Sequence, residues 1–398
     1  MILRQEYLQT LDRWRDKKVI KVITGIRRCG KSYLMNSFID TLLKDGVSKK
    51  QIQHFNLEDL DNEKYLDYHN LYSNIKKNLL DGKMNYIFLD EVQLVKDFQR
   101  CVDSLFLLDN IDIYLTGSNA YLLSGEIATL LSGRYIEINM LPFSFKEYSL
   151  AFDSITKENL YRQYTEYTSF PYAVQLQDDL YQVREYLNGI YNTIVLKDIV
   201  SRKKINDVLL LESVIRFLAD NVGNVTSVKR ISDTLSSNGR KISSHTTESY
   251  IEALIESYVF YPVRRYDIKG LQFLKTGQKY YLTDVGLRNI LLSQKTVDLG
   301  RMLENIVFLE LYRRGLTVYV GKNDKQEIDF ITLKGNNRAY YQVALSVRDE
   351  NTLQRELLPL SEINDHYPKY LLTMDNDMVQ NFDGIKKLYV LDWLMGKI

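Results

Sequence analysis

One short segment, GIRRCGKS at residues 25–32, constrains the fold of this chain more than any other part of the sequence. Two glycines in it are separated by four residues, and a lysine and a serine follow the second glycine. The apolar run VIKVIT precedes the segment, and the helical pattern SYLMNSFIDTLL overlaps its end. Because glycine adopts backbone dihedrals closed to other residues, successive N–H groups of such a loop can turn inward around phosphate oxygens. A strand, this loop and a helix in this order predict a phosphate-binding cradle at the edge of an α/β sheet.

The residue types in this segment fit the chemistry of a nucleoside triphosphate. We expect Lys31 to bridge the β- and γ-phosphates and Ser32 to hold Mg²⁺ through its hydroxyl. The positive end of the following helix adds to the attraction for phosphate. Cys29 is expected to fill the loop as a small residue, because phosphate binding needs no sulfur chemistry. The expected nucleotide-binding residues are Gly25, Ile26, Arg27, Arg28, Cys29, Gly30, Lys31, Ser32 and Tyr33.

A second apolar run, YIFLDE, ends in two carboxylates, Asp90 and Glu91. A buried strand that carries Asp90 to the same sheet edge would place its carboxylate beside the Mg²⁺ shell. Glu91, one residue further on, could then act as general base on the water that attacks the γ-phosphate. A strand that ends in two acids is common by itself, but behind a phosphate loop the pair predicts a hydrolysis site.

Polar residues after the next apolar run, residues 111–116, have two interpretations. In phosphate-loop proteins with an extra strand between the loop strand and the acidic strand, a polar residue here senses the γ-phosphate. Ser118 or Asn119 could take that role, or either could cap a helix that begins at Ala120. Arg134 could be an arginine finger that acts on a neighbouring subunit's nucleotide in a homo-oligomer, or it could be a surface or ion-paired arginine.

The segments GIRRCGKS, YIFLDE, LTGSNA, LSGRY and LPFSFKEY, in this order, resemble those of the AAA-type P-loop ATPases of bacteria and archaea that have a C-terminal nuclease-like domain of unknown function. The resemblance spans nearly the whole chain. It implies binding and hydrolysis of ATP with Mg²⁺, with Lys31 and Ser32 in the phosphate and metal roles. It also implies that Asp90 takes a metal role and Glu91 the base role. The sequence departs from such proteins in one respect, because no second sensor arginine is evident in the helical stretch that follows.

Changes in pattern along the chain predict an α/β protein with four parts. A P-loop ATPase domain with a parallel sheet is expected at residues 1–150, a helical connector or lid at 151–205, a winged helix-turn-helix at 206–295, and an α/β nuclease-like domain at 296–398. The expected strands of the first part lie at residues 19–24, 52–56, 86–90, 111–116 and 135–140.

The winged-helix pattern consists of two helices and a hairpin. A short N-capped helix is expected from residue 227 and a longer one at 243–257, and the segments YVFYPVRRY and YYL predict the hairpin. In a DNA reader, residues 245–249 would face the major groove and the wing would touch phosphates. Residues 227–279 contain nine Lys and Arg against five Asp and Glu. Winged helices also serve as packing modules in multidomain ATPases, so double-stranded DNA and a protein partner both remain candidates.

The last part resembles the PD-(D/E)XK nuclease fold, in which a helix acid, a strand Asp and a neighbouring strand's acid-x-Lys assemble a metal site. Glu304 and Asp329 match the first two positions. Gln342 stands where an acid or Gln is expected, but Ala344 takes the place of the lysine. That lysine helps activate water or stabilise developing charge. We therefore expect this domain to be chemically inert.

Composition limits the remaining alternatives. The net charge of +1 gives no global field that would draw the chain to nucleic acid or to a membrane. Two cysteines and four scattered histidines form no disulfide framework and no zinc pattern. The beginning, MILRQEYLQT, lacks the apolar region of a secretory signal. We expect a cytoplasmic protein with no membrane partner.

Three hypotheses of function follow. The first is an ATPase whose nucleotide state moves the winged-helix and nuclease-like domains. The second is a nucleotide-gated DNA- or protein-binding switch with little turnover. The third is an ATP-dependent nuclease, against which Ala344 argues.

Overall fold

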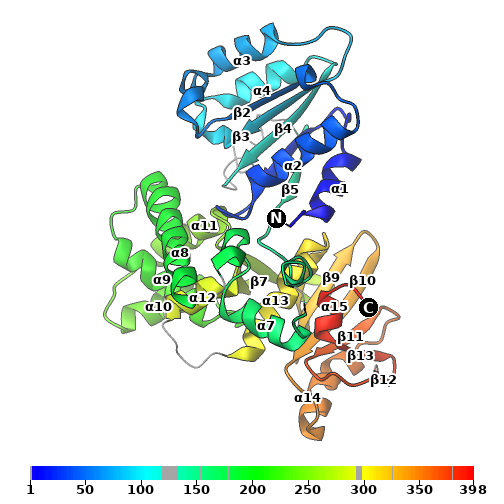
Figure 1. The fold of residues 1–398 in the computed structure, drawn as a ribbon. Helices are drawn as coiled ribbons and strands as arrows, with labels where there is room; N and C mark the ends of the chain where they lie inside the picture. Colours follow the sequence, from blue (N-terminus) through cyan, green and yellow to red (C-terminus); the bar gives the residue numbers. More distant parts are fainter. Residues whose placement is uncertain are drawn as a thin grey trace. The chain divides into compact units, whose positions relative to one another are not determined.

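The computed structural model of the chain describes residues 2–118, 133–152, 154–176, 179–292, 298–324, 326–378 and 380–398 (Figure 1). The chain forms two compact units. The N-terminal unit comprises Met1–Leu141 and Glu256–Tyr258, and the C-terminal unit comprises Pro142–Ile255 and Val259–Ile398. Each unit is built around a sheet of its own.

A five-stranded sheet, in which all neighbouring strands are parallel, forms the centre of the N-terminal unit. Its spatial order is β2-β3-β4-β1-β5, so that β4 lies between β1 and β3. The strands are β1 (Ile20–Thr24), β2 (Ile52–Asn56), β3 (Asn85–Asp90), β4 (Ile111–Gly117) and β5 (Tyr135–Asn139). The predicted parallel sheet is confirmed, and every strand bound lies within one residue of its expected position.

Helices cover both faces of this sheet. The α-helices of the unit are α1 (Gln5–Arg13), α2 (Lys31–Lys44), α3 (Tyr68–Lys77) and α4 (Phe98–Phe106). Short 3₁₀ helices occur at Lys49–Gln51, Leu60–Leu66 and Val92–Leu94.

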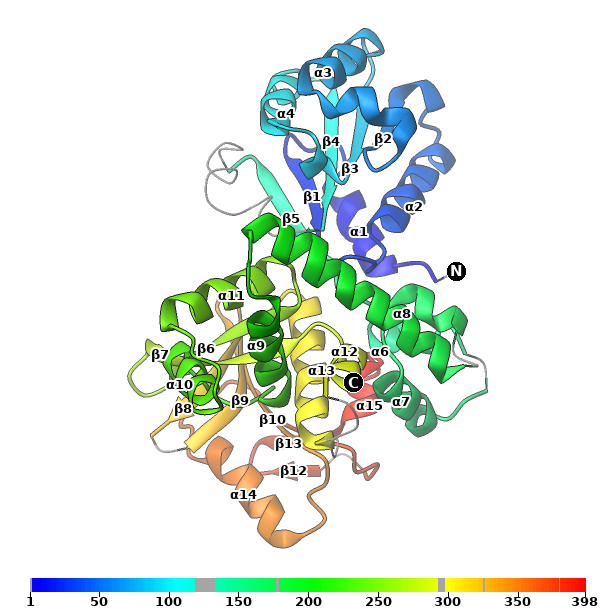
Figure 2. The same ribbon diagram turned by 90° about the vertical axis from the view of Figure 1, so that its left-hand side faces the viewer.

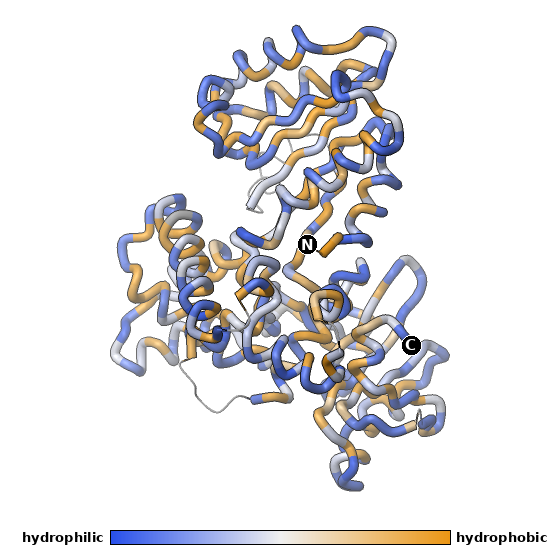
Figure 3. Tube along the Cα trace, viewed as in Figure 1, coloured by the Kyte–Doolittle hydropathy of each residue, from blue (hydrophilic) through white to orange (hydrophobic). Residues whose placement is uncertain are grey.

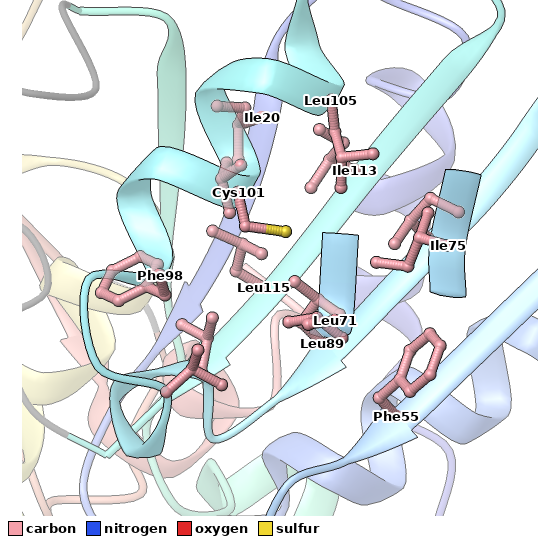
Figure 4. Close-up of a cluster of buried hydrophobic side chains, with 14 of the residues drawn as sticks. Ile20, Phe55, Leu71, Ile75, Leu89, Phe98, Cys101, Leu105, Ile113 and Leu115 are labelled. Atoms are coloured by element: carbon pink, nitrogen blue, oxygen red, sulfur yellow. The ribbon is translucent and has the colours of Figure 1, made fainter. Parts of the chain in front are cut away.

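The core of the N-terminal unit agrees with a parallel sheet that helices cover on both faces. β1, β3 and β4 are buried along their whole length, which is typical of parallel strands covered by helices on both faces. On one face, Leu71 of α3 and Leu105 of α4 belong to one apolar cluster with Leu115 of β4 (Figure 4). On the other face, the ring centroid of Phe38 in α2 lies 5.3 Å from that of Tyr114. Figure 3 shows the apolar residues along these strands.

The helices of the C-terminal unit lie before, between and after the strands of its sheet. They are α6 (Phe145–Ser149), α7 (Lys157–Glu166), α8 (Leu180–Asn192), α9 (Val208–Asp220), α10 (Val228–Ser237), α11 (Ser244–Glu256), α12 (Val285–Leu292), α13 (Leu299–Arg313), α14 (Glu350–Ser361) and α15 (Val390–Leu394), with a 3₁₀ helix at Pro171–Leu176 and a π-helix at Thr193–Ser201 (Figure 2). The predicted helices at residues 227–235 and 243–257 are confirmed. The Ser227 hydroxyl accepts a hydrogen bond from the Arg230 N–H at 3.2 Å, as its predicted N-cap role requires.

Eight strands of the C-terminal unit form one mixed sheet in the order β12-β13-β11-β10-β9-β8-β6-β7. The strands are β6 (Phe260–Asp267), β7 (Gln272–Leu282), β8 (Thr317–Asn323), β9 (Gln326–Lys334), β10 (Asn337–Ala344), β11 (Lys369–Thr373), β12 (Gln380–Phe382) and β13 (Ile385–Tyr389). The predicted hairpin is confirmed as the antiparallel pair β6–β7, and β6 also pairs in parallel with β8. The hairpin therefore shares a sheet with the last strands of the chain, while the boundaries at 150, 205 and 295 stay predictions.

Within the described residues, none of the helices combines the length and the apolar character that crossing a membrane requires.

Candidate functional site

The loop after β1 has the backbone geometry of a phosphate cradle. Gly25 and Gly30 both have positive φ, +141° and +105°, and Arg28 between them has φ 68°. A Cβ added at Gly25 would lie 2.1 Å from the carbonyl oxygen of Met140, so only glycine fits there. The loop turns once, through a hydrogen bond of 3.3 Å from the Cys29 N–H to the Ile26 carbonyl. α2 begins at Lys31, directly after Gly30.

Lys31 points back into this loop. Its side chain is 4% exposed, and its ammonium donates to the carbonyls of Gly25 and Ile26 at 3.1 and 3.3 Å. The same Nζ lies 3.8 Å from Oε1 of Glu91. A buried ammonium held by two carbonyls and one carboxylate is positioned to exchange these partners for phosphate oxygens. Ser32, the second residue of α2, is exposed.

Both predicted acids lie at the carboxyl edge of the sheet, with the loop. β1 and β4 pair in parallel with Thr24 opposite Gly117, and β3 and β4 pair with Leu89 opposite Leu115. The carboxyl ends of all three strands therefore meet at one edge. Asp90 and Glu91 are 2% and 8% exposed there.

Glu91 has an unusual backbone and a perturbed carboxylate. Its φ of 55° and ψ of 50° are left-handed, a conformation that residues other than glycine rarely adopt. Burial acts to raise its pKa, but the Lys31 ammonium and hydrogen bonds that include one from Ser118 outweigh burial, so the pKa of Glu91 lies below its ordinary value. The Ser118 hydroxyl is 3.1 Å from Oε2 of Glu91. The carboxylate is therefore charged at neutral pH and can orient or deprotonate a water.

Two contributors to this edge have no recognisable sequence signal. The buried hydroxyl of Thr116 contacts both acids: the Glu91 N–H donates to it at 2.9 Å, and it donates to Oδ1 of Asp90. Arg4, 1% exposed, donates to the carbonyls of Cys29 and Leu141 at 3.1 and 2.8 Å and so supports the loop. Thr116 reads as an ordinary strand residue, and Arg4 lies far from any motif.

The other predicted site residues are distributed as follows. Cys29 is fully buried, and burial raises the pKa of its thiol, in agreement with a loop-filling role. Arg27 donates to Glu58 at 3.4 Å, while Arg28 is exposed and Tyr33 is half-buried. Asn119 lies outside the described residues.

Arg134 is exposed directly before β5, and its carbonyl accepts from the N–H of Ile20, the first residue of β1. This is the amino edge of the sheet, opposite the loop, so Arg134 does not join the site of its own chain. Its guanidinium carbon lies 5.5 Å from the centroid of the Phe106 ring.

A second charged cluster lies in the C-terminal unit. The acids predicted for the nuclease-like domain, Glu304 and Asp329, come together there, but Lys279 of β7 lies between them. Its ammonium is 2.8 Å from Glu304, 2.9 Å from Glu327 and 3.8 Å from Asp329. The sequence pattern places Lys279 in the hairpin and gives no sign of this contact. An ammonium in this position replaces the cation that such acids would otherwise hold, and among the described residues no three His, Cys, Asp or Glu side chains are arranged for a metal ion.

Gln342 and Ala344 complete the comparison with the nuclease pattern. The Asp329 N–H donates to the Gln342 side chain at 3.3 Å, and Gln342 in turn donates to Glu356 at 2.9 Å. Ala344 ends β10 without a group that could activate water. The nuclease-like character of residues 296–398 stays a prediction.

The cradle at residues 25–32 fits ATP and Mg²⁺. At Gly25 the Met140 carbonyl comes so close that any side chain would push the loop out of this conformation, so the sequence keeps the loop backbone in the form that phosphate binding requires. Lys31 supplies a positive charge, and the Ser32 hydroxyl and the Asp90 carboxylate are oxygen donors of the kind Mg²⁺ prefers. Asp90 and Ser32 would hold the metal, and Lys31 and the loop amides would hold the phosphates.

Comparison with known proteins agrees with this geometry. Residues 17–149 match a family model described as an AAA domain, and residues 158–298 match a domain of unknown function. An uncharacterized protein of Haemophilus influenzae is 41% identical over 400 residues, which is 99% of this chain and 99% of that protein. An uncharacterized protein of Methanocaldococcus jannaschii is 29% identical and covers 94% of this chain and 85% of its own length.

Among solved structures, the Walker-type ATPase PABY2304 of Pyrococcus abyssi is similar with a TM-score of 0.50 and 15% identity, over 73% of this chain and 96% of that one. At this identity the likeness concerns the fold alone. The predicted AAA-type domain is confirmed by the family match. The chain therefore belongs to the family of the Haemophilus influenzae protein, and its residues 17–149 form an AAA domain of the P-loop class.

Proposed function

We propose that this protein binds ATP with Mg²⁺ in the cradle at residues 25–32 and hydrolyses it. The observation that carries the proposal is the convergence of the glycine loop, Lys31, Asp90 and Glu91 at one sheet edge. The AAA-domain match over residues 17–149 also supports it.

In this proposal each residue has one task. Lys31 leaves the carbonyls of Gly25 and Ile26 and binds the β- and γ-phosphates. Mg²⁺ supplies positive charge that neutralises the phosphate oxygens as negative charge develops on them. Glu91, charged at neutral pH, orients the attacking water and accepts its proton. Ser118, bonded to Glu91, is close enough to report the γ-phosphate to that carboxylate.

Two substitutions separate binding from turnover. Lys31→Ala should abolish nucleotide binding, because Lys31 is the only lysine among the residues assigned to the cradle and its ammonium is expected to bind the phosphates. Glu91→Gln should keep binding and lower the turnover number by about 10²–10⁴-fold, the usual contribution of a general base. Glu63→Gln, at an exposed position of the same unit, is the matched control and should change neither. Titration with ATP and with GTP, followed by phosphate release, provides both readouts.

A wild-type protein that never releases phosphate, with or without DNA, would contradict the proposal.

We further propose that nucleotide state changes the arrangement of the C-terminal unit and that Arg134 completes the site of a neighbouring subunit. The position of Arg134 at the amino edge supports a role in trans, since its own cradle is at the other edge. ATP turnover per chain should then rise with protein concentration, together with the mass of the particle, and Arg134→Ala should remove this dependence. A rate per chain that is independent of concentration would refute the role in trans.

Double-stranded DNA binding is a second candidate function. It is favoured by His245, Glu248 and Ser249, which are exposed in the first turns of α11, and by the basic residues Lys229, Arg230, Arg240 and Lys241, which are exposed in α10 and in the segment before α11. If these residues neutralise phosphates, the logarithm of the affinity should fall linearly with the logarithm of salt concentration. Replacing Arg240 and Lys241 by Gln should weaken binding to all sequences and reduce that slope by about one for each phosphate that is no longer neutralised. Failure to bind a duplex at low salt would remove this candidate.

A further inference from the structure

The hydroxyl of Thr116 occupies a junction between the two acids of the proposed ATPase site. Thr116 is the last residue but one of β4, it is fully buried, and β4 lies next to β3. The Glu91 N–H donates to Oγ1 at 2.9 Å, and the same oxygen donates to Oδ1 of Asp90. One side chain thereby contacts the metal acid and the base residue together.

The chemistry of a hydroxyl fixes the direction of both bonds. Threonine has one hydrogen to donate and two lone pairs to accept with. The amide of Glu91 can only donate, so it takes a lone pair of Thr116. The single hydrogen of Thr116 is then available for Asp90 and orients the carboxylate through Oδ1. Oδ2 of Asp90 takes no part in this bond and would be available to a metal ion.

The same bond acts on the backbone of Glu91. A left-handed residue that is not glycine persists only where its surroundings hold it, and here the Glu91 amide is held by Thr116. In this conformation the Glu91 carboxylate accepts from Ser118 at 3.1 Å and lies 3.8 Å from the Lys31 ammonium. A change at Thr116 would therefore reach the base through the peptide and the metal acid through its carboxylate.

We propose that Thr116 is a positioning residue of the site: its hydroxyl orients Asp90 toward Mg²⁺ and holds the peptide of Glu91 so that the base faces the γ-phosphate. This inference rests on the proposed function and adds to it a residue that touches neither nucleotide nor metal. Groups that orient metal ligands in this way commonly change metal affinity or activity by about 10–100-fold.

The test measures metal-dependent nucleotide binding, which needs no turnover. A fluorescent, non-hydrolysable ATP analogue is bound first in EDTA and then during titration with MgCl₂. Thr116→Val keeps the shape of the side chain and removes the hydroxyl. We expect wild-type affinity in EDTA, an Mg²⁺ concentration for half-maximal effect that rises by about 10–100-fold, and a similar fall in the turnover number. Thr116→Ser, which restores the hydroxyl, should return both quantities close to the wild-type values.

Two controls separate positioning from folding. Thr165→Val removes another buried hydroxyl, which donates to the Tyr161 carbonyl at 3.0 Å in the C-terminal unit, and should leave the Mg²⁺ titration unchanged. Thr116→Ala provides a second test if the valine variant does not fold, because it removes the hydroxyl without adding a methyl group. The thermal transition and the affinity in EDTA report whether each variant keeps its cradle.

The outcomes are distinct. An unchanged Mg²⁺ midpoint in Thr116→Val, or a midpoint that Thr116→Ser does not restore, overturns the inference. Loss of binding in EDTA by both Thr116→Val and Thr116→Ala also overturns it, because the role of Thr116 would then be limited to folding. A wild-type protein that binds the analogue with Mg²⁺ but releases no phosphate refutes the proposed hydrolysis alone, and the titration still decides the role of Thr116. A wild-type protein that binds no nucleotide overturns both.

Discussion

Removing the ammonium of Lys279 should destabilise the C-terminal unit strongly, because the acids Glu304, Glu327 and Asp329 lose their shared partner. The Lys279 side chain is 2% exposed, and those of Glu304 and Asp329 are 13% and 14% exposed, so neither acid is well hydrated. Lys279→Met keeps the length of the stem and deletes the charge. Breaking a buried ion pair from one side typically costs about 3–5 kcal/mol of unfolding free energy. For a unit of this size the melting temperature should then fall by roughly 6–20 °C.

The assay is thermal unfolding followed by circular dichroism, with Lys269→Met as the matched control. Lys269 lies in the turn of the same hairpin and pairs with Asp324, but both side chains are 60% exposed, so its loss should leave the melting temperature nearly unchanged. Adding Glu304→Gln to Lys279→Met should recover part of the loss, since it removes one of the repelling charges. A Lys279→Met protein as stable as the wild type, or a double variant that shows no coupling, would refute the reasoning.

Two further predictions concern the cradle and the acidic cluster. Gly25→Ala should abolish nucleotide binding in a fluorescence titration, because its Cβ would meet the Met140 carbonyl at 2.1 Å. The control Gly189→Ala, in a helix with open space around the substituted position, should bind nucleotide as the wild type does. A Gly25→Ala protein with wild-type affinity would contradict the cradle geometry. Burial and the Glu304 charge raise the pKa of Asp329 to about 8. Between about pH 4 and pH 8 the folded state therefore retains a proton that the unfolded state has lost. The free energy of unfolding should fall as pH rises through this range, by at most about 1.4 kcal/mol per pH unit from this group. Asp329→Asn removes that proton equilibrium, so the difference in melting temperature between this variant and the wild type should change steadily across this pH range. A difference that does not vary with pH would be evidence against the raised pKa of Asp329.

The N-terminal unit could be predicted from the sequence because its signals are local. Strands buried on both faces form continuous apolar runs, and the glycines and the lysine of the loop stand close to one another in the chain. Asp90 ends its strand and Glu91 follows it directly, so their edge of the sheet was predictable once the sheet was known to be parallel. The role of Thr116 was not predictable from the sequence. It depends on which strand lies next to β4 and on the left-handed backbone of Glu91, for which the sequence has no recognisable signal.

The C-terminal unit was harder to predict because its contacts are distant along the chain. The two helices and the hairpin carry local cap and turn signals, and these elements were predictable. The pairing of β6 with β8, and the approach of Lys279 to Asp329, join segments about fifty residues apart and leave no periodic pattern. The nuclease pattern expects a lysine two residues after Gln342, on the same strand. A basic residue does lie among these acids, but the hairpin supplies it.

The eight-stranded sheet has a practical consequence for anyone who wishes to study the end of this chain separately. A fragment that starts at residue 296 would retain β8 to β13 but lose β6, and the edge of β8 would then have unpaired N–H and C=O groups where β6 had been. It would also leave Glu304 and Asp329 without the ammonium of Lys279. Such a fragment should aggregate or misfold, whereas one that begins before the hairpin keeps both the strand edge and the charge balance intact.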